Sequence, residues 1–304
     1  MKGTLADLAS ILRLHIVTIA ALATLVFGWL LTGSYPWPLA LVVALDWLLI
    51  NLFNRVTDLL EDAANGIQGT ALIARRPRAF AAFAWALLAS SFAVTHVLWP
   101  ALTPWRAAVQ AIGLGYSYRI VPTPRGWRRF KDLYVLKNGM SAVLFVLTVL
   151  AYPLVVAGGP TGALAGWRTA AALAVFFFLF EQTYEILYDL RDLEGDRLAG
   201  IPTYPVVHGP EVARRIIDGL LVACAAPLVL AFATGAIGVR EALLLAAPPA
   251  QLALYRPRYR RGLTSADCKL LTHAGSCLLL AYLVGTRAWL ALGLPPNIVL
   301  GHPA

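Results

Sequence analysis

Two short segments of the chain carry acidic residues at a repeated four-residue spacing. The first contains Asn54, Asp58 and Asp62, and the second contains Asp192 and Asp196. Residues four apart lie on one face of an α-helix, so each segment would present its carboxylates together. Like charges at this spacing repel by about 0.2–0.5 kcal/mol per pair in water, and by more where water is scarce. A bound cation is therefore expected, and Mg²⁺ fits because it often binds one or two carboxylates together with substrate phosphates.

The second segment also carries Asp189, one turn before Asp192 and on much the same face. Either segment alone could be a solvated acidic helix end. Two such segments facing each other could instead hold Mg²⁺ on a diphosphate and neutralise the charge that develops on a leaving group. We therefore predict that Asp58, Asp62, Asp189, Asp192 and Asp196 are metal ligands on which catalysis depends.

A basic segment that also carries tyrosines lies between the two acidic segments. Arginine suits bidentate contacts with phosphate, and lysine supplies a compact positive charge. The positive charges could also serve membrane topology alone, but we expect at least some of them to contact phosphate. The predicted substrate-binding residues are Asn54, Tyr116, Tyr118, Arg128, Arg129, Lys131 and Lys137.

Two further carboxylates, Glu181 and Glu185, precede the second acidic segment inside an apolar run. Carboxylates within a membrane span are costly and usually face a cavity or a partner. Our hypothesis is that Glu185 contacts the acceptor or takes its proton, which makes it a candidate catalytic residue. A structural role, in which Glu185 pairs with an arginine or a tyrosine and stabilises the bundle, is an equally weighted alternative.

The elements that position these residues must be membrane helices. Hydrophobic residues make up 59% of the 304 positions and charged residues 13%, and the mean hydropathy is +0.70. Only helices or closed barrels satisfy their backbone hydrogen bonds in lipid, and the apolar runs are too long for barrel strands. We predict nine spanning helices, near residues 14–33, 36–53, 79–99, 104–120, 138–157, 168–190, 212–234, 240–255 and 269–293.

The positions of lysine and arginine give an independent test, because cytoplasmic loops carry an excess of positive charge. With the N-terminus and the loops after the even-numbered spans on one side, the other side holds only Arg106, Arg168, Arg240 and Arg287 of the 25 basic residues. We therefore expect a cytoplasmic N-terminus, a C-terminus on the opposite side, and a bacterial inner-membrane location. The expected fold is an all-α integral membrane protein. It is a single domain over residues 1–304, a nine-helix bundle around a central cavity open to the cytoplasm.

The net charge of +9 does not indicate a nucleic-acid partner. The basic residues lie in short loops beside membrane helices, where anionic lipid headgroups and topology account for most of them. We expect membrane lipids and no nucleic acid as partners.

The acidic motifs resemble those of the UbiA superfamily of intramembrane prenyltransferases. Asn54, Asp58 and Asp62 match the family's N-x-x-x-D-x-x-x-D motif, and the second segment matches D-x-x-D-x-x-x-D. Residues 200–206 resemble the family's G-I-x-T-L-P-V continuation. The resemblance implies a nine-helix bundle in which the motifs bind Mg²⁺ and the diphosphate of an allylic isoprenoid. It also implies that the enzyme transfers the isoprenyl group to an acceptor and releases pyrophosphate.

The chain departs from the family pattern at positions that leave the acceptor open. Arg55 stands where many relatives carry another aspartate, Tyr204 replaces a common leucine, and residues 63–70 lack the R-P-I-x-S-G run of many quinone-pathway members. We expect a small aromatic or lipid-like acceptor, with an aromatic ring favoured. Aromatic residues of the sixth span are candidates for contact with the isoprenoid chain, although packing or lipid contact is the commoner role of such residues. They are Phe176, Phe177, Phe178 and Phe180.

Two alternatives remain open at this stage. Some relatives are terpene cyclases, which ionise the same diphosphates and close the cation on its own chain. A transporter would also carry intramembrane carboxylates, but it would be expected to place them near the bilayer midplane rather than at the ends of spans.

Overall fold

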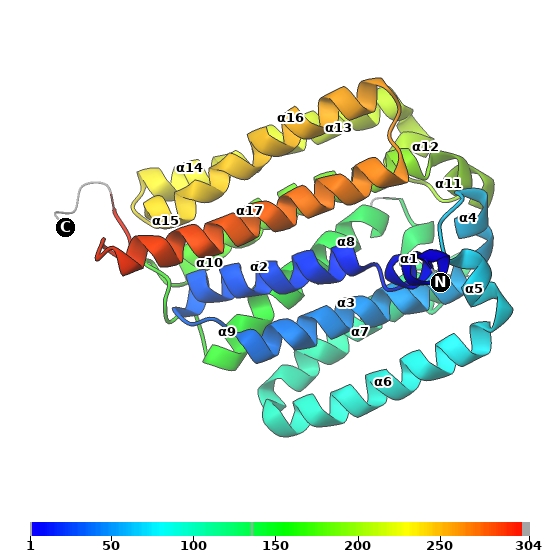
Figure 1. The fold of residues 1–304 in the computed structure, drawn as a ribbon, viewed down its shortest axis with the longest axis horizontal. Coiled ribbons are helices and arrows are strands. Elements are labelled where there is room, and N and C mark those ends of the chain that lie inside the picture. Colours follow the sequence, from blue (N-terminus) through cyan, green and yellow to red (C-terminus); the bar gives the residue numbers. More distant parts are fainter. Residues whose placement is uncertain (1, 135, 300–304) are drawn as a thin grey trace.

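The computed structural model describes residues 2–134 and 136–299. Its helices lie side by side along one long axis and form a single elongated bundle (Figure 1). Seven helical segments are long and apolar enough to cross a membrane by length and composition, which supports an integral membrane protein. They are α2 (Leu14–Thr32), α3 (Trp37–Thr57), α6 (Pro77–Leu98), the segment Leu136–Ala157, α10 (Trp167–Arg191), the segment Pro210–Ala233 and α17 (Ser265–Ala291).

The expected count of nine spans is not confirmed. The fourth expected span corresponds to α7 (Thr103–Ser117), whose 15 residues extend only about 22 Å, less than the hydrocarbon core of a bilayer. The eighth corresponds to a segment interrupted by a 3₁₀ turn before Pro248 and Pro249, which cannot donate backbone hydrogen bonds. Its pieces are α15 (Val239–Ala242), η4 (Leu243–Ala246) and α16 (Ala247–Arg260).

Two of the spanning segments consist of more than one helical piece. The segment Leu136–Ala157 contains a π-helical turn just before Pro153, whose ring prevents an ordinary α-helical hydrogen bond. The pieces are α8 (Leu136–Val146), η3 (Leu147–Ala151) and α9 (Tyr152–Ala157) in one segment, and α13 (Pro210–Ala223) and α14 (Ala225–Ala233) in the other.

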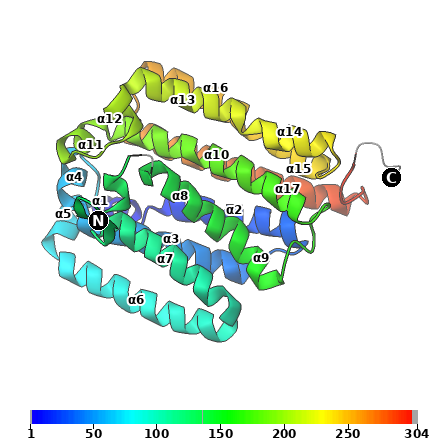
Figure 2. The same ribbon diagram turned by 180° about the vertical axis from the view of Figure 1, so that it is seen from behind.

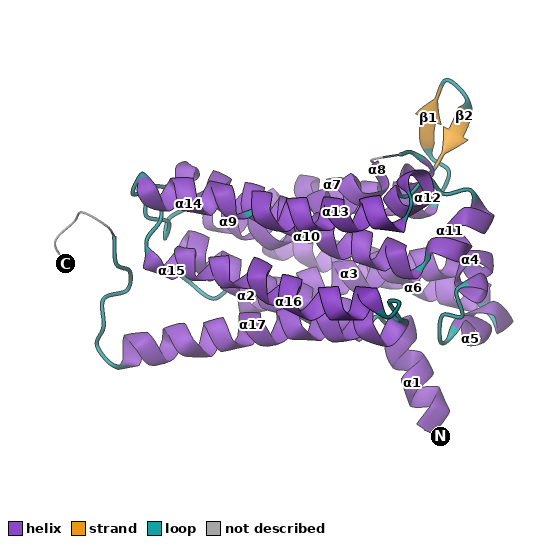
Figure 3. Cartoon of the chain, turned by 90° about the horizontal axis from the view of Figure 1, so that it is seen from above, coloured by secondary structure: helices purple, strands orange, loops and turns teal. Residues whose placement is uncertain are grey.

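Most of the short elements gather at the end of the bundle that also carries the N-terminus (Figures 1 and 3). A β-hairpin extends sideways from this end, and the C-terminal segment leaves the opposite end. The elements at the N-terminal end are α1 (Lys2–Ile11), α4 (Leu59–Ala64), α5 (Thr70–Arg75), β1 (Val121–Thr123), β2 (Gly126–Arg128), η2 (Phe130–Asp132), α11 (Leu193–Ala199) and α12 (Tyr204–His208). The remaining turn is η1 (Pro100–Leu102), between α6 and α7.

Helices α2, α3, α8 and α10 form the middle of the bundle, while α6 lies along one edge and α13 with α16 along the other (Figures 1 and 2). The packed core includes a stacked pair on α3 and α8, Trp47 and Phe145, with ring centroids 3.8 Å apart. The indole of Trp47 also donates a hydrogen bond to Thr148 Oγ1 at 3.1 Å. These contacts fix α3, which leads to the first acidic segment, against α8, which follows the basic segment.

A buried ion pair joins α3 to α7. Arg106 and Asp46 are both fully buried, with Nη2 and Oδ1 2.7 Å apart. Gln110 and Tyr152 donate further hydrogen bonds to the same carboxylate. The sequence predicted that Arg106 lies among the basic residues on the side of the membrane opposite the N-terminus. Instead, these two side chains meet each other inside the bundle, because α7 packs against α3 at this level.

Candidate active site

Each acidic motif is built on a long helix, a break and a short helix. Helix α3 ends at Thr57 and α4 begins at Leu59, while α10 ends at Arg191 and α11 begins at Leu193. The residue at each break is the motif aspartate, Asp58 or Asp192. Backbone hydrogen bonds still follow the four-residue spacing across both breaks, for example from Asp62 N to Asp58 O at 2.8 Å. The expected spacing is therefore retained, although the helices are not continuous.

The two short helices contact each other directly. The backbone N–H of Gly195 on α11 donates a hydrogen bond to Asn65 Oδ1, just after α4, at 2.9 Å. A β-carbon at Gly195 would lie 2.3–2.5 Å from the Asn65 side chain, so only glycine permits this approach. This contact brings together two motifs that are far apart in the sequence.

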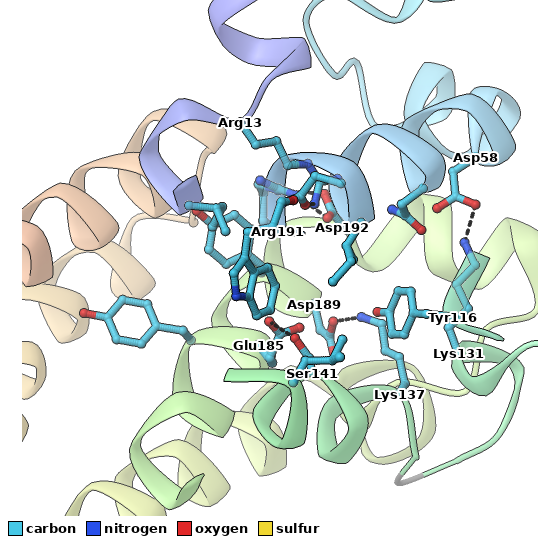
Figure 4. Close-up of a pocket in the computed structure, with 18 of the residues that line it drawn as sticks. Arg13, Asp58, Tyr116, Lys131, Lys137, Ser141, Glu185, Asp189, Arg191 and Asp192 are labelled. Atoms are coloured by element: carbon cyan, nitrogen blue, oxygen red, sulfur yellow. Dashed lines mark hydrogen bonds and ion pairs between the residues drawn. The ribbon is translucent and has the colours of Figure 1, made fainter. Parts of the chain in front are cut away.

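One cavity at this end of the bundle is lined by residues of both motifs (Figure 4). Of the predicted site residues, ten line it. They are Asn54, Asp58, Asp62, Tyr116, Lys131, Lys137, Glu185, Asp189, Asp192 and Asp196. The structure therefore places side chains from α3, α4, α7, α8, α10 and α11 around a single space.

The first motif is paired with the basic segment. Lys131 is 2% exposed, and its Nζ lies 2.5 Å from Asp58 Oδ1 and 2.6 Å from Glu61 Oε2. Burial raises the pKa of the Asp58 carboxyl to about 6, although the positive charge of Lys131 opposes the shift. Arg129 supports this group from outside the cavity lining, with its Nη1 3.3 Å from Asp58 Oδ1.

The second motif has its own basic partners. Lys137 forms an ion pair with Asp189, and Asn138 donates a hydrogen bond to the other oxygen of that carboxylate at 2.8 Å. Arg191 pairs with Asp192, its Nε lying 2.7 Å from Oδ1. Basic groups therefore neutralise both of these motif carboxylates.

Arg55, the residue that departs from the family pattern, is fully buried and binds Asp62 with an Nη1–Oδ2 distance of 2.5 Å. Its Nη2 also donates a hydrogen bond to the carbonyl of Gln68 at 2.6 Å. Arg55 thus connects the first motif to the loop that lacks the usual family sequence. These two departures form one structural unit.

The residues around the cavity suit Mg²⁺. Within the described part of the chain, several buried side-chain oxygens have no hydrogen-bond partner. Two of them, Asn54 Oδ1 and Asp196 Oδ2, belong to residues that line the cavity. The described part of the chain contains no group of three histidine, cysteine, aspartate or glutamate side chains close enough together to hold a metal ion without a substrate. The unpartnered carboxylate and amide oxygens are the kind of ligand that Mg²⁺ takes, together with phosphate oxygens and water.

Two glutamates lie deeper along α10. Glu185 accepts a hydrogen bond from Ser141 Oγ at 2.8 Å, so its partner is a serine rather than the arginine or tyrosine considered from the sequence. Glu181 is 7% exposed and lines both the polar cavity and an adjoining apolar chamber. Three of the four candidate phenylalanines line the apolar chamber, namely Phe176, Phe177 and Phe180.

Three of the predicted substrate-binding residues lie outside the cavity lining. Tyr118 packs against Phe53, with ring centroids 6.2 Å apart. Arg128 is exposed on the β-hairpin, and Arg129 contacts the cavity only through Asp58 and Glu61. Tyr116 lies in the last turn of α7 and faces the cavity, whereas Tyr118, at the C-cap of that helix, packs toward α3.

Several lining or supporting residues did not stand out in the sequence. They are Arg13, Asn51, Glu61, Asn138, Ser141 and Arg191. Glu61, Asn138 and Arg191 adjoin the predicted motifs, and their polar character next to an apolar span was the available signal. Arg13 is far from the motifs in sequence, and only the packing of α2 beside α3 and α10 brings it to the site.

Comparison with known proteins identifies a family. The model of the UbiA prenyltransferase family matches residues 50–273. A digeranylgeranylglyceryl phosphate synthase from Methanopyrus kandleri is 38% identical over 95 residues, which cover 31% of this chain and 35% of that protein. The enzyme of the same name from Halobacterium salinarum is 29% identical over 187 residues, covering 61% of this chain and 60% of that protein. The matches thus span about a third and three fifths of these relatives' lengths.

The fold agrees with that of solved structures. A UbiA homologue from Archaeoglobus fulgidus, bound to GPP and Mg²⁺, superposes with a TM-score of 0.69. Sequence identity is 20%, and the alignment covers 92% of this chain and 98% of the homologue. These relatives are archaeal and give no support to the expected bacterial location. The family match covers both acidic motifs and the basic segment between them, and the chain therefore belongs to the UbiA prenyltransferase family.

Proposed function

We propose that the chain is a single-domain, Mg²⁺-dependent intramembrane prenyltransferase. Its donor is an allylic isoprenyl diphosphate, and its product is released together with pyrophosphate. The observation that carries this proposal is the single cavity lined by both aspartate motifs and by Lys131 and Lys137. We also propose that this end of the bundle faces the cytoplasm, since most basic residues lie near it.

The donor's two parts match the two connected spaces. The diphosphate is held at the polar end, where Lys131 and Lys137 can donate hydrogen bonds to its oxygens. Carboxylates of both motifs and Asn54 would hold Mg²⁺, which would supply positive charge to neutralise the leaving diphosphate. The isoprenoid chain extends into the apolar chamber beside Phe176 and Phe177.

The reaction breaks the allylic C–O bond, and its electron pair leaves with pyrophosphate. Apolar side chains of α3 and α8, among them Trp47 and Phe145, line the cavity and keep water from the allylic cation. A nucleophilic atom of the acceptor then forms the new bond to carbon. Glu185, fixed by Ser141, is positioned to accept the proton that the acceptor loses.

We further propose that the acceptor is a lipid alcohol rather than an aromatic ring. The matching relatives are named for a glyceryl phosphate that carries two geranylgeranyl groups, so their final transfer joins an isoprenyl chain to a glyceryl lipid. An alcohol must lose its proton as the ether bond forms, which is the step assigned to Glu185. The aromatic acceptor favoured by the sequence gains no support from these relatives.

The test is a screen of purified protein in nanodiscs with geranyl, farnesyl and geranylgeranyl diphosphates. Each donor is combined with a geranylgeranylglyceryl lipid, an aromatic acid or no acceptor, and products are identified by mass spectrometry. We expect a glyceryl ether, pyrophosphate release that stops with EDTA, and recovery with Mg²⁺. A cyclic hydrocarbon or alcohol formed without acceptor would instead establish a terpene cyclase, and failure to consume any diphosphate would overturn the proposal.

The role of Glu185 has its own test. Glu185→Gln retains the shape and the hydrogen-bonding capacity of the side chain but cannot accept a proton at neutral pH. We expect the rate of transfer to fall at least tenfold while donor binding is retained. Normal turnover of this variant would exclude the base role.

A further inference from the structure

The turn between α1 and α2 holds an arginine at the cavity, in an unusual backbone conformation. Arg13 has φ 43° and ψ 49°, in the left-handed region, and it is the one non-glycine residue with positive φ in the described part of the chain. Such a conformation is disfavoured for side chains other than glycine, asparagine and aspartate. Even so, an arginine stands here, and its side chain lines the cavity (Figure 4).

The guanidinium of Arg13 has little protein to bind. Its Nη1 donates one hydrogen bond, to Asn51 Oδ1 at 3.1 Å, and Asn51 is itself fixed by donating to the carbonyl of Trp47 at 2.7 Å. Among the residues that the structure describes, Arg13 forms no ion pair. The motif aspartates, in contrast, already have basic partners. A guanidinium has five N–H donors, so most of those on Arg13 are available to an anion in the cavity.

This group lies on a different side of the cavity from the two lysines (Figure 4). Lys131 lies in η2 and Lys137 in the first turn of α8, whereas Arg13 is the N-cap residue of α2. His15, two residues further on, stacks against Tyr188 of α10, and the guanidinium of Arg191 covers the same tyrosine ring at 4.6 Å. The Arg13 turn is thereby packed against the end of α10. The cavity thus has two separate cationic regions.

An apolar stripe leads from Arg13 into the membrane. Ile16 and Ile19 line the polar cavity, and Ile19, Ala23 and Phe27 line the apolar chamber. These residues are three or four apart on α2 and share one face of the helix. A ligand that follows this face would place an anionic group at Arg13 and a hydrocarbon chain along the stripe.

We infer that Arg13 binds the anionic headgroup of an amphiphilic acceptor, with phosphate as the matching chemistry. The inference rests on the proposed function and deepens it, since it assigns one cationic region to the donor diphosphate and the other to the acceptor. Recognition by Arg13 also sets specificity, because an uncharged lipid alcohol leaves the guanidinium without its partner.

The test compares two acceptors that differ only in charge, geranylgeranylglyceryl phosphate and geranylgeranylglycerol, with geranylgeranyl diphosphate as donor. The wild-type protein should prefer the phosphate form at least tenfold in kcat/KM. Arg13→Gly removes the guanidinium and suits the left-handed backbone, so the fold is retained. This variant should raise the KM for the phosphate acceptor at least tenfold, change the donor KM less than twofold, and abolish the preference. Arg13→Lys should retain part of the preference for the phosphate acceptor, because the lysine keeps the positive charge.

The matched control is Arg197→Gln, at an exposed arginine on α11 whose side chain is 57% accessible and lies outside the cavity lining. It should behave as wild type. An unchanged preference in Arg13→Gly would overturn the inference while leaving the prenyltransferase intact. A rise in donor KM alone would likewise overturn it, since Arg13 would then belong to the diphosphate region. If the wild-type protein released no pyrophosphate with any donor, the proposed function itself would fail.

Discussion

Arg106 and Asp46 form a fully buried ion pair between α7 and α3, with Nη2 of the arginine 2.7 Å from Oδ1 of the aspartate. Both side chains are completely inaccessible, and the carboxylate also accepts hydrogen bonds from Gln110 and Tyr152. The pair lies within the bundle and outside the lining of the acidic cavity. Its role is therefore structural, which separates it from the nearby carboxylates of the motifs.

Breaking this pair should destabilise the protein without altering its chemistry. Arg106→Met leaves Asp46 buried without its counter-charge, and we expect a loss of about 3–5 kcal/mol in the free energy of unfolding. The double variant with Asp46→Leu should recover more than half of that loss, because neither charge remains. Thermal unfolding in detergent measures both effects. Equal destabilisation in the single and double variants would show that the pairing itself is unimportant.

The two motif aspartates at the helix breaks should be essential for activity. Asp58→Ala or Asp192→Ala should lower Mg²⁺-dependent pyrophosphate release by at least about 100-fold, the scale of losing a main electrostatic contact in the transition state. The matched control is Glu194→Ala, since this carboxylate is in the second motif but 73% exposed and paired with Arg197. It should retain normal turnover, and both aspartate variants should remain folded and inserted in the membrane. Activity retained in both aspartate variants would contradict the proposed site.

The close contact between α4 and α11 should tolerate no side chain at Gly195. Gly195→Ala places a methyl group 2.3 Å from Asn65 Nδ2, and overpacking of this kind costs about 1–3 kcal/mol. We expect weaker Mg²⁺-dependent activity, because the two motifs are forced apart. Asn65→Ala in the same chain should restore much of it by making room. Gly219→Ala is the control, because a β-carbon at that position meets no atom within 4 Å.

The Arg129–Asp132 pair should make stability depend on pH in the acidic range. Burial disfavours the ionised carboxylate, but hydrogen bonds and charge from Arg129 outweigh it and hold the pKa of Asp132 below its usual value. The stabilisation is therefore complete above the unfolded-state pKa near 4 and is lost as the pH falls through the lower, folded-state pKa. Asp132→Asn should cost about 1 kcal/mol at pH 7 and progressively less below pH 4. The unfolding temperatures of the two proteins at pH 7 and pH 3.5 give the comparison, and an equal difference at both would refute the assignment.

The local parts of the site follow from the sequence. The four-residue spacing of Asp58 and Asp62, and of Asp192 and Asp196, predicted residues that share one cavity, and the structure places all four in its lining. Such motifs are readable because helical periodicity relates sequence spacing directly to position on a face. The apolar runs likewise predicted a membrane bundle, since the bilayer restricts the possible backbone structures.

The long-range parts do not follow from the sequence. Nothing local indicates that Arg106 pairs with a residue 60 positions away, or that Arg13 meets Asn51 of α3 at the site. The breaks at Asp58 and Asp192 also escaped prediction, because no proline or glycine marks them. Tyr118 and Arg128 appeared equivalent to Tyr116 and Lys131 in sequence. The structure separates them because Tyr118 lies just beyond the end of α7 and Arg128 lies on the exposed β-hairpin, whereas Lys131 is buried in η2.

The ion pairs in the cavity have a consequence for substrate entry. Two ion pairs join motif aspartates to lysines, Asp58 to Lys131 and Asp189 to Lys137. Each buried carboxylate therefore has a positive counter-charge inside the protein. Under the proposed function, each lysine would exchange its carboxylate for a phosphate oxygen when the diphosphate binds, and the freed carboxylates would be available to hold Mg²⁺. Binding of this kind would exchange one set of ionic partners for another and would change the net charge of the cavity little. Such a cavity can bind a highly charged headgroup without the free-energy cost of leaving unpaired charges in a low-dielectric environment.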